Sequence, residues 1–307
     1  MITKPMLAGK APADLDDVNY PVLASAKLDG IRCLMRGGKA LTRTFKPIPN
    51  DHIRNWLEAN VPDGLDGELM PMDPAVPFKE FSGHVRRKTG SPAFVYRVFD
   101  FVGEFVDGTS DLDTPFSERF LSLETWEEMH ATYLDHVEVV DHVFVNNAEA
   151  LRYLHAELCG QGYEGTMIRD PQGPYKCGRS TTKKGELLKV KDFADEEAVI
   201  TDVFELMHND NEADVDAFGR TKRSSHKEFK RGSGTLGGFR CEFADGTAFS
   251  VGTGFNAKDR ADLWAIQDTL IGKTVKIKHQ PDPGGRTEGT APRFPVWLGF
   301  RDPITDV

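Results

Sequence analysis

Three acid–glycine pairs, each beside a short apolar run, constrain the folding of this chain more than any other feature. The pairs are Asp29-Gly30, Asp66-Gly67 and Glu164-Gly165. Glycine lets a backbone turn tightly or approach a ligand closely, and a neighbouring carboxylate can bind a cation or orient a hydroxyl. We therefore expect short strands that meet at functional turns. Helical patterns after Asn50 or Asp51 and after Asn147 lie between these strands.

Lys27 is the candidate nucleophile, because it follows the apolar run Val22–Ala24 and comes just before Asp29 and Arg32. An amine becomes nucleophilic only after it loses its proton, and burial or a neighbouring cation favours that loss. Asp29 lies on the same face as Lys27 if the segment is extended. A surface β-turn with an Asp-Gly corner would show the same residues, so this stretch alone does not decide between a site and a turn.

Further candidates lie along the chain. Glu68 could accept a hydrogen bond from a ribose hydroxyl, bind a divalent ion, or stand solvated at a hairpin edge. Phe99 and Phe101 are predicted to share one face of a strand, where they would pack in the core or stack on a purine. Lys189 and Lys191 share one face of an extended segment, which suits a phosphate with a bound metal.

The charge distribution is uneven. The net charge of -10 argues against a nucleic-acid partner. However, residues 176–191 and 220–231 each carry six basic residues against one acidic residue, a local charge of +5. Such segments are either solvated charge runs or contacts to phosphate groups.

Several classes of protein are disfavoured by composition. No apolar run approaches the roughly 18 residues of a membrane span, and residues 1–8 lack a signal-peptide core, so a cytoplasmic protein without membrane contact is predicted. The four cysteines are scattered and form no Cys-x-x-Cys pair, which indicates neither a disulfide framework nor a zinc site.

The length of 307 residues predicts about two domains. Around residue 193 the pattern changes to short strands with one helix that begins near Asn256, which is typical of a small oligonucleotide-binding (OB) barrel. Residues 210–234 form a polar insert that is first acidic and then basic, and that cannot form a core of its own.

Taken together, five motifs resemble, in order and spacing, the nucleotidyltransferase motifs of ATP-dependent DNA ligases. The motifs are Lys27–Arg32, Asp66–Glu68, Phe99–Phe101, Glu164–Arg169 and Lys189–Lys191. Residues 43–48, 176–181 and 292–295 resemble segments of the minimal ligases of phages and of large DNA viruses such as Chlorella virus. The resemblance covers nearly the whole chain.

This resemblance implies an α+β fold. An adenylyltransferase domain of antiparallel sheets with helices would span residues 1–193. A C-terminal OB-fold β-barrel would span residues 194–307 and carry a latch insert at about 210–234.

The family reaction uses ATP and Mg²⁺, with Mn²⁺ as a substitute. It passes through lysyl-AMP on Lys27 and a DNA-adenylate, and it seals a 3′-hydroxyl to a 5′-phosphate in nicked duplex DNA. The family also implies a monomer.

The resemblance assigns roles to particular residues. The catalytic set would be Lys27, Asp29, Lys189 and Lys191. Nucleotide contacts would come from Arg32, Arg43, Glu68, Phe99, Glu164 and Arg293, and the metal would be held by Asp29 and Glu164. Contacts to DNA would come from Lys176, Arg179, Lys222, Arg223, Lys227, Lys230 and Arg231.

Two alternatives remain open on the sequence. One is another lysyl-nucleotidyltransferase, either an RNA ligase or an mRNA capping enzyme, since these share the Lys-x-Asp-Gly motif. The other, from a different class, is a non-catalytic OB-fold protein that binds nucleic acid. Formation of a covalent AMP adduct on Lys27 would exclude the second alternative.

Overall fold

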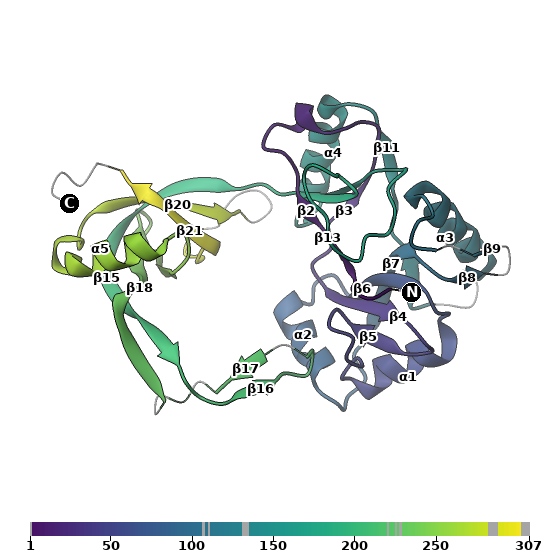
Figure 1. Cartoon of the computed structure of the whole chain (residues 1–307), viewed down its shortest axis with the longest axis horizontal. Coiled ribbons are helices and arrows are strands. Elements are labelled where there is room, and N and C mark those ends of the chain that lie inside the picture. Colours follow the sequence, from purple (N-terminus) through teal and green to yellow (C-terminus); the bar gives the residue numbers. More distant parts are fainter. Residues whose placement is uncertain are drawn as a thin grey trace. The chain divides into compact units, whose positions relative to one another are not determined.

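The computed structural model describes residues 2–105, 108–109, 111–130, 135–219, 221–224, 226, 229–281 and 288–301. The chain divides into two compact units (Figure 1). The first consists of Met1–Val190 with Val215–Thr221, and the second of Lys191–Asp214 with Lys222–Val307. Among the helices of the described ranges, none is both long enough and apolar enough to span a membrane.

The first unit is built on two five-stranded sheets. One has the order β10-β7-β6-β4-β5, with β10 at Val137–Val139, β7 at Phe94–Phe101, β6 at Leu65–Pro71, β4 at Ile31–Met35 and β5 at Ala40–Thr42. The other has the order β11-β3-β12-β14-β2, with β11 at Val143–Val145, β3 at Val22–Ala26, β12 at Thr166–Arg169, β14 at Leu187–Val190 and β2 at Gly9–Lys10. Neighbouring strands are antiparallel except in the β10–β7 and β14–β2 pairs.

The remaining elements of this unit are four α-helices, one 3₁₀ helix and short strand pairs. The helices are η1 (Leu15–Asp17), α1 (Asp51–Asn60), α2 (Phe78–Arg86), α3 (Phe116–His130) and α4 (Ala148–Gly160). The pairs are β1 (Met6–Leu7) with β13 (Gly178–Arg179), and β8 (Glu104–Phe105) with β9 (Gly108–Thr109). The predicted mixture of helices and antiparallel sheets is therefore confirmed.

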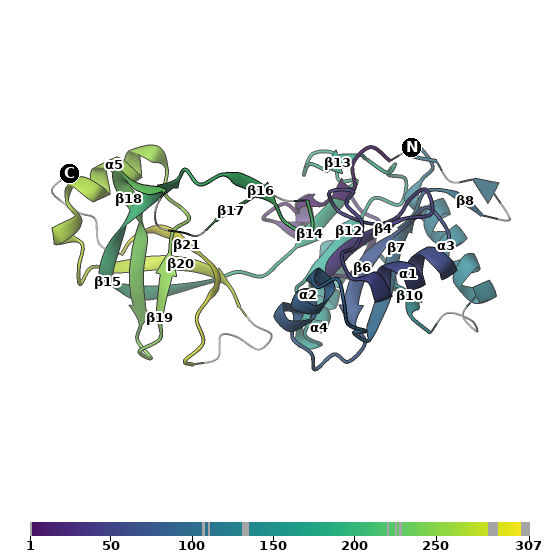
Figure 2. The ribbon, with the colours of Figure 1, turned by 90° about the horizontal axis from the view of Figure 1, so that it is seen from below.

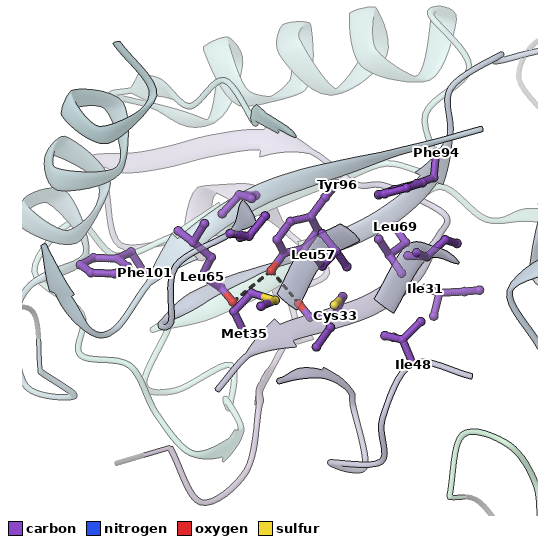
Figure 3. Close-up of a cluster of buried hydrophobic side chains, with 14 of the residues drawn as sticks. Ile31, Cys33, Met35, Ile48, Leu57, Leu65, Leu69, Phe94, Tyr96 and Phe101 are labelled. Carbon is purple, nitrogen blue, oxygen red and sulfur yellow. Dashed lines mark hydrogen bonds between the residues drawn. The ribbon is translucent and has the colours of Figure 1, made fainter. Parts of the chain in front are cut away.

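The first sheet packs against α1, α2 and α3 around a buried apolar cluster, part of which is drawn in Figure 3. The Tyr96 hydroxyl lies inside this cluster and donates to the carbonyls of Cys33 and Leu65, at 3.0 Å each, so the buried phenol is satisfied. On α1, Ile53 and Leu57 are fully buried one turn apart. Asn50, rather than Asp51, caps that helix, since its side chain accepts from the Ile53 amide.

A bulge in β7 overturns one expectation from the sequence. Gly67 pairs with Val98 and Asp66 with Asp100, so Phe99 has no partner on β6. An extra residue of this kind reverses the facing of the strand residues beyond it. Phe101 is consequently buried in the apolar cluster, whereas Phe99 is partly exposed. The prediction that these two rings share one face is wrong.

The second sheet packs against α4. Its buried cluster includes Val22, Ala24, Ile168 and Leu188 from the strands and Leu151 from the helix. Asn147 caps α4 by accepting from the Ala150 amide at 2.9 Å, as predicted.

The second unit contains a five-stranded sheet in the order β19-β18-β15-β20-β21 (Figure 2). The strands are β15 (Ala194–Asn209), β18 (Lys230–Phe243), β19 (Ala248–Val251), β20 (Thr274–Gln280) and β21 (Arg293–Phe300), with the helices α5 (Ala257–Ala265) and η2 (Gln267–Thr269). In the described part of the unit no ladder joins β19 to β21, although the Trp297 amide donates to Thr253 just after β19. The fold is OB-like, as predicted, and the barrel is not closed in the described residues.

The polar insert is shorter than predicted. Lys230 and Arg231 pair with Asn209 and His208, so residues 230–234 belong to β18. Between β15 and β18 lies a small hairpin of β16 (Ala213–Val215) and β17 (Thr221–Arg223). The two strands of this hairpin pair with each other, which satisfies backbone groups despite the polar side chains.

The tip of this hairpin belongs to the first unit. Phe218 is 4% exposed and is part of the apolar cluster of that unit. The Thr44 hydroxyl donates to the Phe218 carbonyl, and the Arg86 guanidinium carbon lies 5.2 Å from the centre of the Phe218 ring. One aromatic side chain therefore anchors an otherwise polar tip.

Candidate active site

A cavity of about 210 Å³ in the first unit is lined by residues from both sheets. Its lining is Leu7, Ala8, Ser25, Ala26, Lys27, Leu28, Arg32, Arg43, Glu68, Phe99, His142, Met167, Arg169, Arg179, Leu187 and Lys189. The fold thus brings together Lys27, Arg32, Arg43, Glu68, Phe99, Arg179 and Lys189, which are distant in sequence and were predicted to share a site.

The pairing of β3 with β12 places Lys27 beside Glu164. The Lys27 amide donates to the Gly165 carbonyl at 2.8 Å, and the Glu164 amide donates to the Lys27 carbonyl at 3.2 Å. The Lys27 ammonium contacts the Glu164 carboxylate, and it also donates to the Leu28 carbonyl at 3.3 Å. Both side chains are largely buried, so the amine is held in one position at the cavity wall.

Strand register also explains the position of Lys189. Met167 in β12 pairs with Ser25 in β3 on one side and with Lys189 in β14 on the other. Residues in such a cross-strand row share a face of the sheet, and all three line the cavity. Lys27 is two residues beyond Ser25 and lies on the same face. Two amines therefore reach the cavity from one sheet.

On the opposite sheet, a buried ion pair positions Arg32. Its Nε and Nη2 donate to the two carboxylate oxygens of Asp66 at 2.5 and 2.6 Å. Burial acts to lower the pKa of Arg32, but the negative charge of Asp66 outweighs it and raises that pKa. Asp66 also accepts from the Tyr175 hydroxyl at 2.6 Å. Arg32 is therefore a fixed cation, 4.6 Å from the centre of the Phe99 ring.

Glu68 pairs with Arg32 across β6 and β4 and is partly buried in the cavity wall. Burial raises the pKa of its carboxyl to about 7, although the charges of Arg32 and Lys27 act in the opposite direction. A carboxyl with such a pKa changes charge near neutral pH and is a candidate for contact with a ligand hydroxyl.

Behind Phe99 lies a buried cluster of one carboxylate and two arginines. Asp100 accepts from Arg119 at 2.8 and 3.2 Å and from Arg169 at 2.5 Å. Burial acts to raise the pKa of Asp100, but the two guanidinium groups lower it to about 2. The Arg169 guanidinium carbon lies 5.8 Å from the centre of the Phe99 ring, so this cluster supports the aromatic wall.

Three predicted residues of the first unit, Asp29, Lys176 and Glu164, lie outside the cavity lining. Asp29 is partly buried in the turn between β3 and β4, where its charge contributes to the raised pKa of Glu68. The Lys176 amine is 3.7 Å from the Glu186 carboxylate. The Glu164 carboxylate contacts the Lys27 amine at the cavity wall.

The other predicted residues belong to the second unit or to the insert. The Lys191 amine donates to the Gln280 side chain at 3.3 Å, and Arg293 begins β21. Lys222 is exposed on β17. The guanidinium of Arg223 donates to the Asn211 carbonyl, and that of Arg231 donates to Asp210 at 2.7 Å.

Two further residues were predicted in the latch. Lys230 is the first residue of β18 and is partly buried. Lys227 lies outside the described residues.

The side chains near Lys27 have the donor chemistry that Mg²⁺ prefers. Asp29, Glu68 and Glu164 offer carboxylate oxygens, which are hard ligands suited to this ion. The residues present therefore fit the metal that the sequence implies.

Some lining residues were not predicted. Ser25 could have been found from strand alternation, since it lies two residues before Lys27. Met167 reaches the cavity through its pairing with Lys189 and Ser25, which only the strand register shows. His142 has a weaker signal, a single polar ring in the run Val139–Val145. Asp66, Asp100 and Arg119 support the site, and only their burial distinguishes them.

A larger cavity, of about 330 Å³, lies elsewhere in the first unit. Its walls include Tyr20, Pro21, Phe144 and Pro171, and it contains none of the predicted site residues. Volume alone would therefore have selected a cavity that none of the predicted residues line.

Comparison with known proteins points to one family. Residues 5–191 match the family model described as ATP dependent DNA ligase domain, and residues 230–301 match DNA ligase OB-like domain.

Individual relatives agree with these models. The crystal structure of Chlorella virus DNA ligase-adenylate is 32% identical, with a TM-score of 0.57, and the match covers 98% of this chain and 100% of that one. A DNA ligase of Haemophilus influenzae is 24% identical over 91% of this chain and 87% of its own length. A DNA ligase of African swine fever virus is 30% identical over 59% of this chain and 44% of its own length.

Proposed function

This chain belongs to the ATP-dependent DNA ligase family, and from that premise we propose that it seals nicks in duplex DNA through a lysyl-AMP intermediate on Lys27. One observation carries the proposal: the Lys27 amine shares a single cavity with Glu68, Phe99, Arg32 and Lys189. These groups supply a nucleophile, an acceptor for a sugar hydroxyl, a stacking ring and cations for a phosphate.

In the first step, the Lys27 ammonium gives a proton to the Glu164 carboxylate that it contacts, and the freed nitrogen attacks the α-phosphorus of ATP. A nitrogen–phosphorus bond forms, and pyrophosphate leaves with the electrons of the broken phosphorus–oxygen bond. The contact with Glu164 orients the amine. Lys189 lines the cavity and opposes the charge that develops on the α-phosphate. The family resemblance assigns the pyrophosphate contact to Arg293. Phe99 stacks on the base, while Glu68 accepts from the ribose.

Asp29 and Glu164 would hold Mg²⁺, with Mn²⁺ as a substitute. The bound ion would neutralise phosphate charge in a site that already contains several carboxylates.

The second and third steps use DNA. The 5′-phosphate of the nick displaces Lys27 from the AMP, and the 3′-hydroxyl then attacks that 5′-phosphate and releases AMP. Arg43 and Arg179 line the cavity and would contact the 5′-phosphate, while Lys191 would join Lys189 in charge neutralisation.

Basic residues of the insert and its surroundings would contact the DNA backbone. They are Lys176, Lys222, Arg223, Lys227, Lys230 and Arg231. We assign residues 1–193 to adenylyl transfer and residues 194–307 to DNA binding by the OB-like domain and its latch. The protein would act as a monomer on DNA in the cytoplasm.

The direct test is to incubate the purified protein with ATP and Mg²⁺ and to measure its intact mass. The wild type should gain one AMP, and Lys27→Ala should gain none. Lys39→Ala is a matched control, since Lys39 is an exposed lysine paired with Glu58, and it should gain AMP like the wild type. A Lys27→Ala protein that still gains AMP would overturn the assignment of the nucleophile.

Substrate class is tested separately. The protein should seal a duplex DNA nick with ATP and not with GTP, and an all-RNA nick should be sealed more slowly. Faster sealing of RNA would favour an RNA ligase, and a covalent GMP adduct would favour a capping-type enzyme. Affinity for nicked DNA should fall steeply with salt, and Lys222→Ala should reduce the log–log salt slope by about 1.

A further inference from the structure

His142 lines the proposed nucleotide cavity but has no role in the mechanism above. It immediately precedes β11, and Val143 of that strand pairs with Ala24 in β3. The imidazole is therefore near the end of β3 that carries Ser25 and Lys27. One side of the ring packs against Phe116 and Phe120, with centroid separations of 5.2 and 4.6 Å.

The hydrogen-bonding state of this imidazole is set by its neighbours. Nδ1 lies 2.8 Å from the Val140 carbonyl, which can only accept, so Nδ1 carries the hydrogen. Nε2 then presents a lone pair. This atom is shielded from water and has no partner among the described residues. A buried acceptor without a donor destabilises a fold unless a ligand satisfies it.

The imidazole also stays neutral. Burial and the nearby charge of Arg169 lower the pKa of His142 to about 3, although the Val140 carbonyl acts in the opposite direction. At neutral pH the lone pair on Nε2 is therefore retained.

We propose that His142 selects the base of the nucleotide, because its Nε2 accepts a hydrogen bond from the exocyclic amino group of adenine. The inference rests on the proposed function of the cavity. Adenine carries a donor at this position of the ring, whereas guanine carries a carbonyl, and two acceptors facing each other repel. Discrimination of this kind is strong when the wrong ligand leaves a buried polar group unpaired.

The test measures binding without chemistry. ATP, purine riboside triphosphate and GTP are titrated into the protein by calorimetry in EDTA, so no covalent step occurs. Purine riboside triphosphate differs from ATP only in the missing amino group. The wild type should bind ATP about tenfold more tightly than the purine analogue, and GTP should bind still more weakly.

Two variants assign this preference to the imidazole. In His142→Leu the ratio of ATP to purine affinity should fall to about 1, and His142→Gln should recover part of it because its amide oxygen can accept. His130→Leu is the matched control. His130 makes the same bond, from its Nδ1 to the Trp126 carbonyl at 2.8 Å, but lies outside the cavity lining. That variant should keep the wild-type ratio.

The inference is overturned if the wild type binds ATP and the purine analogue equally, or if His142→Leu keeps the wild-type ratio, since the ring would then serve packing alone. If His142→Leu does not fold, the wild-type comparison and His142→Gln still decide. Failure of the proposed function has a different readout: selective ATP binding in EDTA with no AMP adduct after Mg²⁺ is added.

Discussion

Two carboxyl groups on neighbouring strands of one sheet, Asp100 in β7 and Glu68 in β6, have opposite electrostatic environments. Asp100 is fully buried and accepts from Arg119 and Arg169, and its pKa falls to about 2. Glu68 faces the cavity, no side chain in the described ranges donates to its carboxylate, and its pKa rises to about 7. The difference separates a group that holds the wall together from one that is left available to a ligand.

The largest expected effect comes from removing the negative charge of Asp100, which is paired with two arginines. Asp100→Asn keeps the shape of the side chain but leaves two buried guanidinium groups without a counter-charge. We expect a loss of about 3–5 kcal/mol in the free energy of unfolding, measured with urea. A change below about 1 kcal/mol would mean that the cluster is hydrated and contributes little.

The stability of the wild type at low pH should also depend on the Asp100 carboxylate. The folded-state pKa of Asp100 is below its usual value of 3.8. Its contribution is therefore present above pH 3.8 and is lost as the pH falls through about 2. Asp100→Asn should flatten the stability curve in that window, and an unchanged curve would contradict the assignment.

The next comparison is between Phe99, at the bulge of β7, and Phe101, which lies beyond the bulge on the same strand. Phe101→Ala should cost about 3–5 kcal/mol in unfolding free energy, because the ring is fully buried. Phe99→Ala should cost less stability and should weaken ATP binding by about 1–3 kcal/mol through lost stacking. Equal stability losses, with no effect on ATP binding, would remove the distinction between the two rings.

Removing the charge of Glu68 should change the free energy of unfolding less than removing that of Asp100, and in the opposite direction. Its folded-state pKa is raised, so its contribution to stability is present below its usual value of 4.5 and is lost as the pH rises through about 7. Glu68→Gln should therefore be more stable than the wild type at pH 8.5, by up to about 3 kcal/mol, and nearly equal at pH 4.5.

The same Glu68→Gln variant should bind ATP more weakly at pH 8.5, because an amide oxygen is a poorer acceptor than a carboxylate. Thermal melts at the two pH values and calorimetric titration provide the measurements. A variant that is less stable at pH 8.5 would show that the Glu68 carboxylate already has a good partner.

The smallest effect is expected at the surface. Glu58 pairs with Lys39 at 3.2 Å, and the Lys39 side chain is 63% exposed. Glu58→Gln should change the unfolding free energy by less than about 1 kcal/mol. A larger loss would show that burial is not what distinguishes Asp100 from an ordinary ion pair.

Short-range patterns were sufficient for much of the fold. Asn50 and Asn147 cap the helices that the sequence indicated, because a cap needs only a side-chain oxygen and the amide three residues later. The division into short strands and helices was predictable for the same reason, since turn residues and apolar periodicity are local.

Long-range packing decided what these patterns could not. The bulge at Phe99 depends on pairing with β6, and no residue within β7 indicates it. The lack of a ladder between β19 and β21 in the described residues, and the extension of β18 into the predicted insert, depend on register between strands that are distant in sequence.

The sequence by itself determined the chemical parts of the site: an amine at Lys27, carboxylates after glycines, an aromatic ring and two lysines in a recognisable order. Tertiary structure alone decided which of these parts face one cavity and which electrostatic environment each receives. The physical reason is that residue type sets the charge a group can carry, whereas burial and partners, which come from distant segments, set its pKa and whether its hydrogen bonds are already made. Glu68 and His142 differ from Asp100 in that respect.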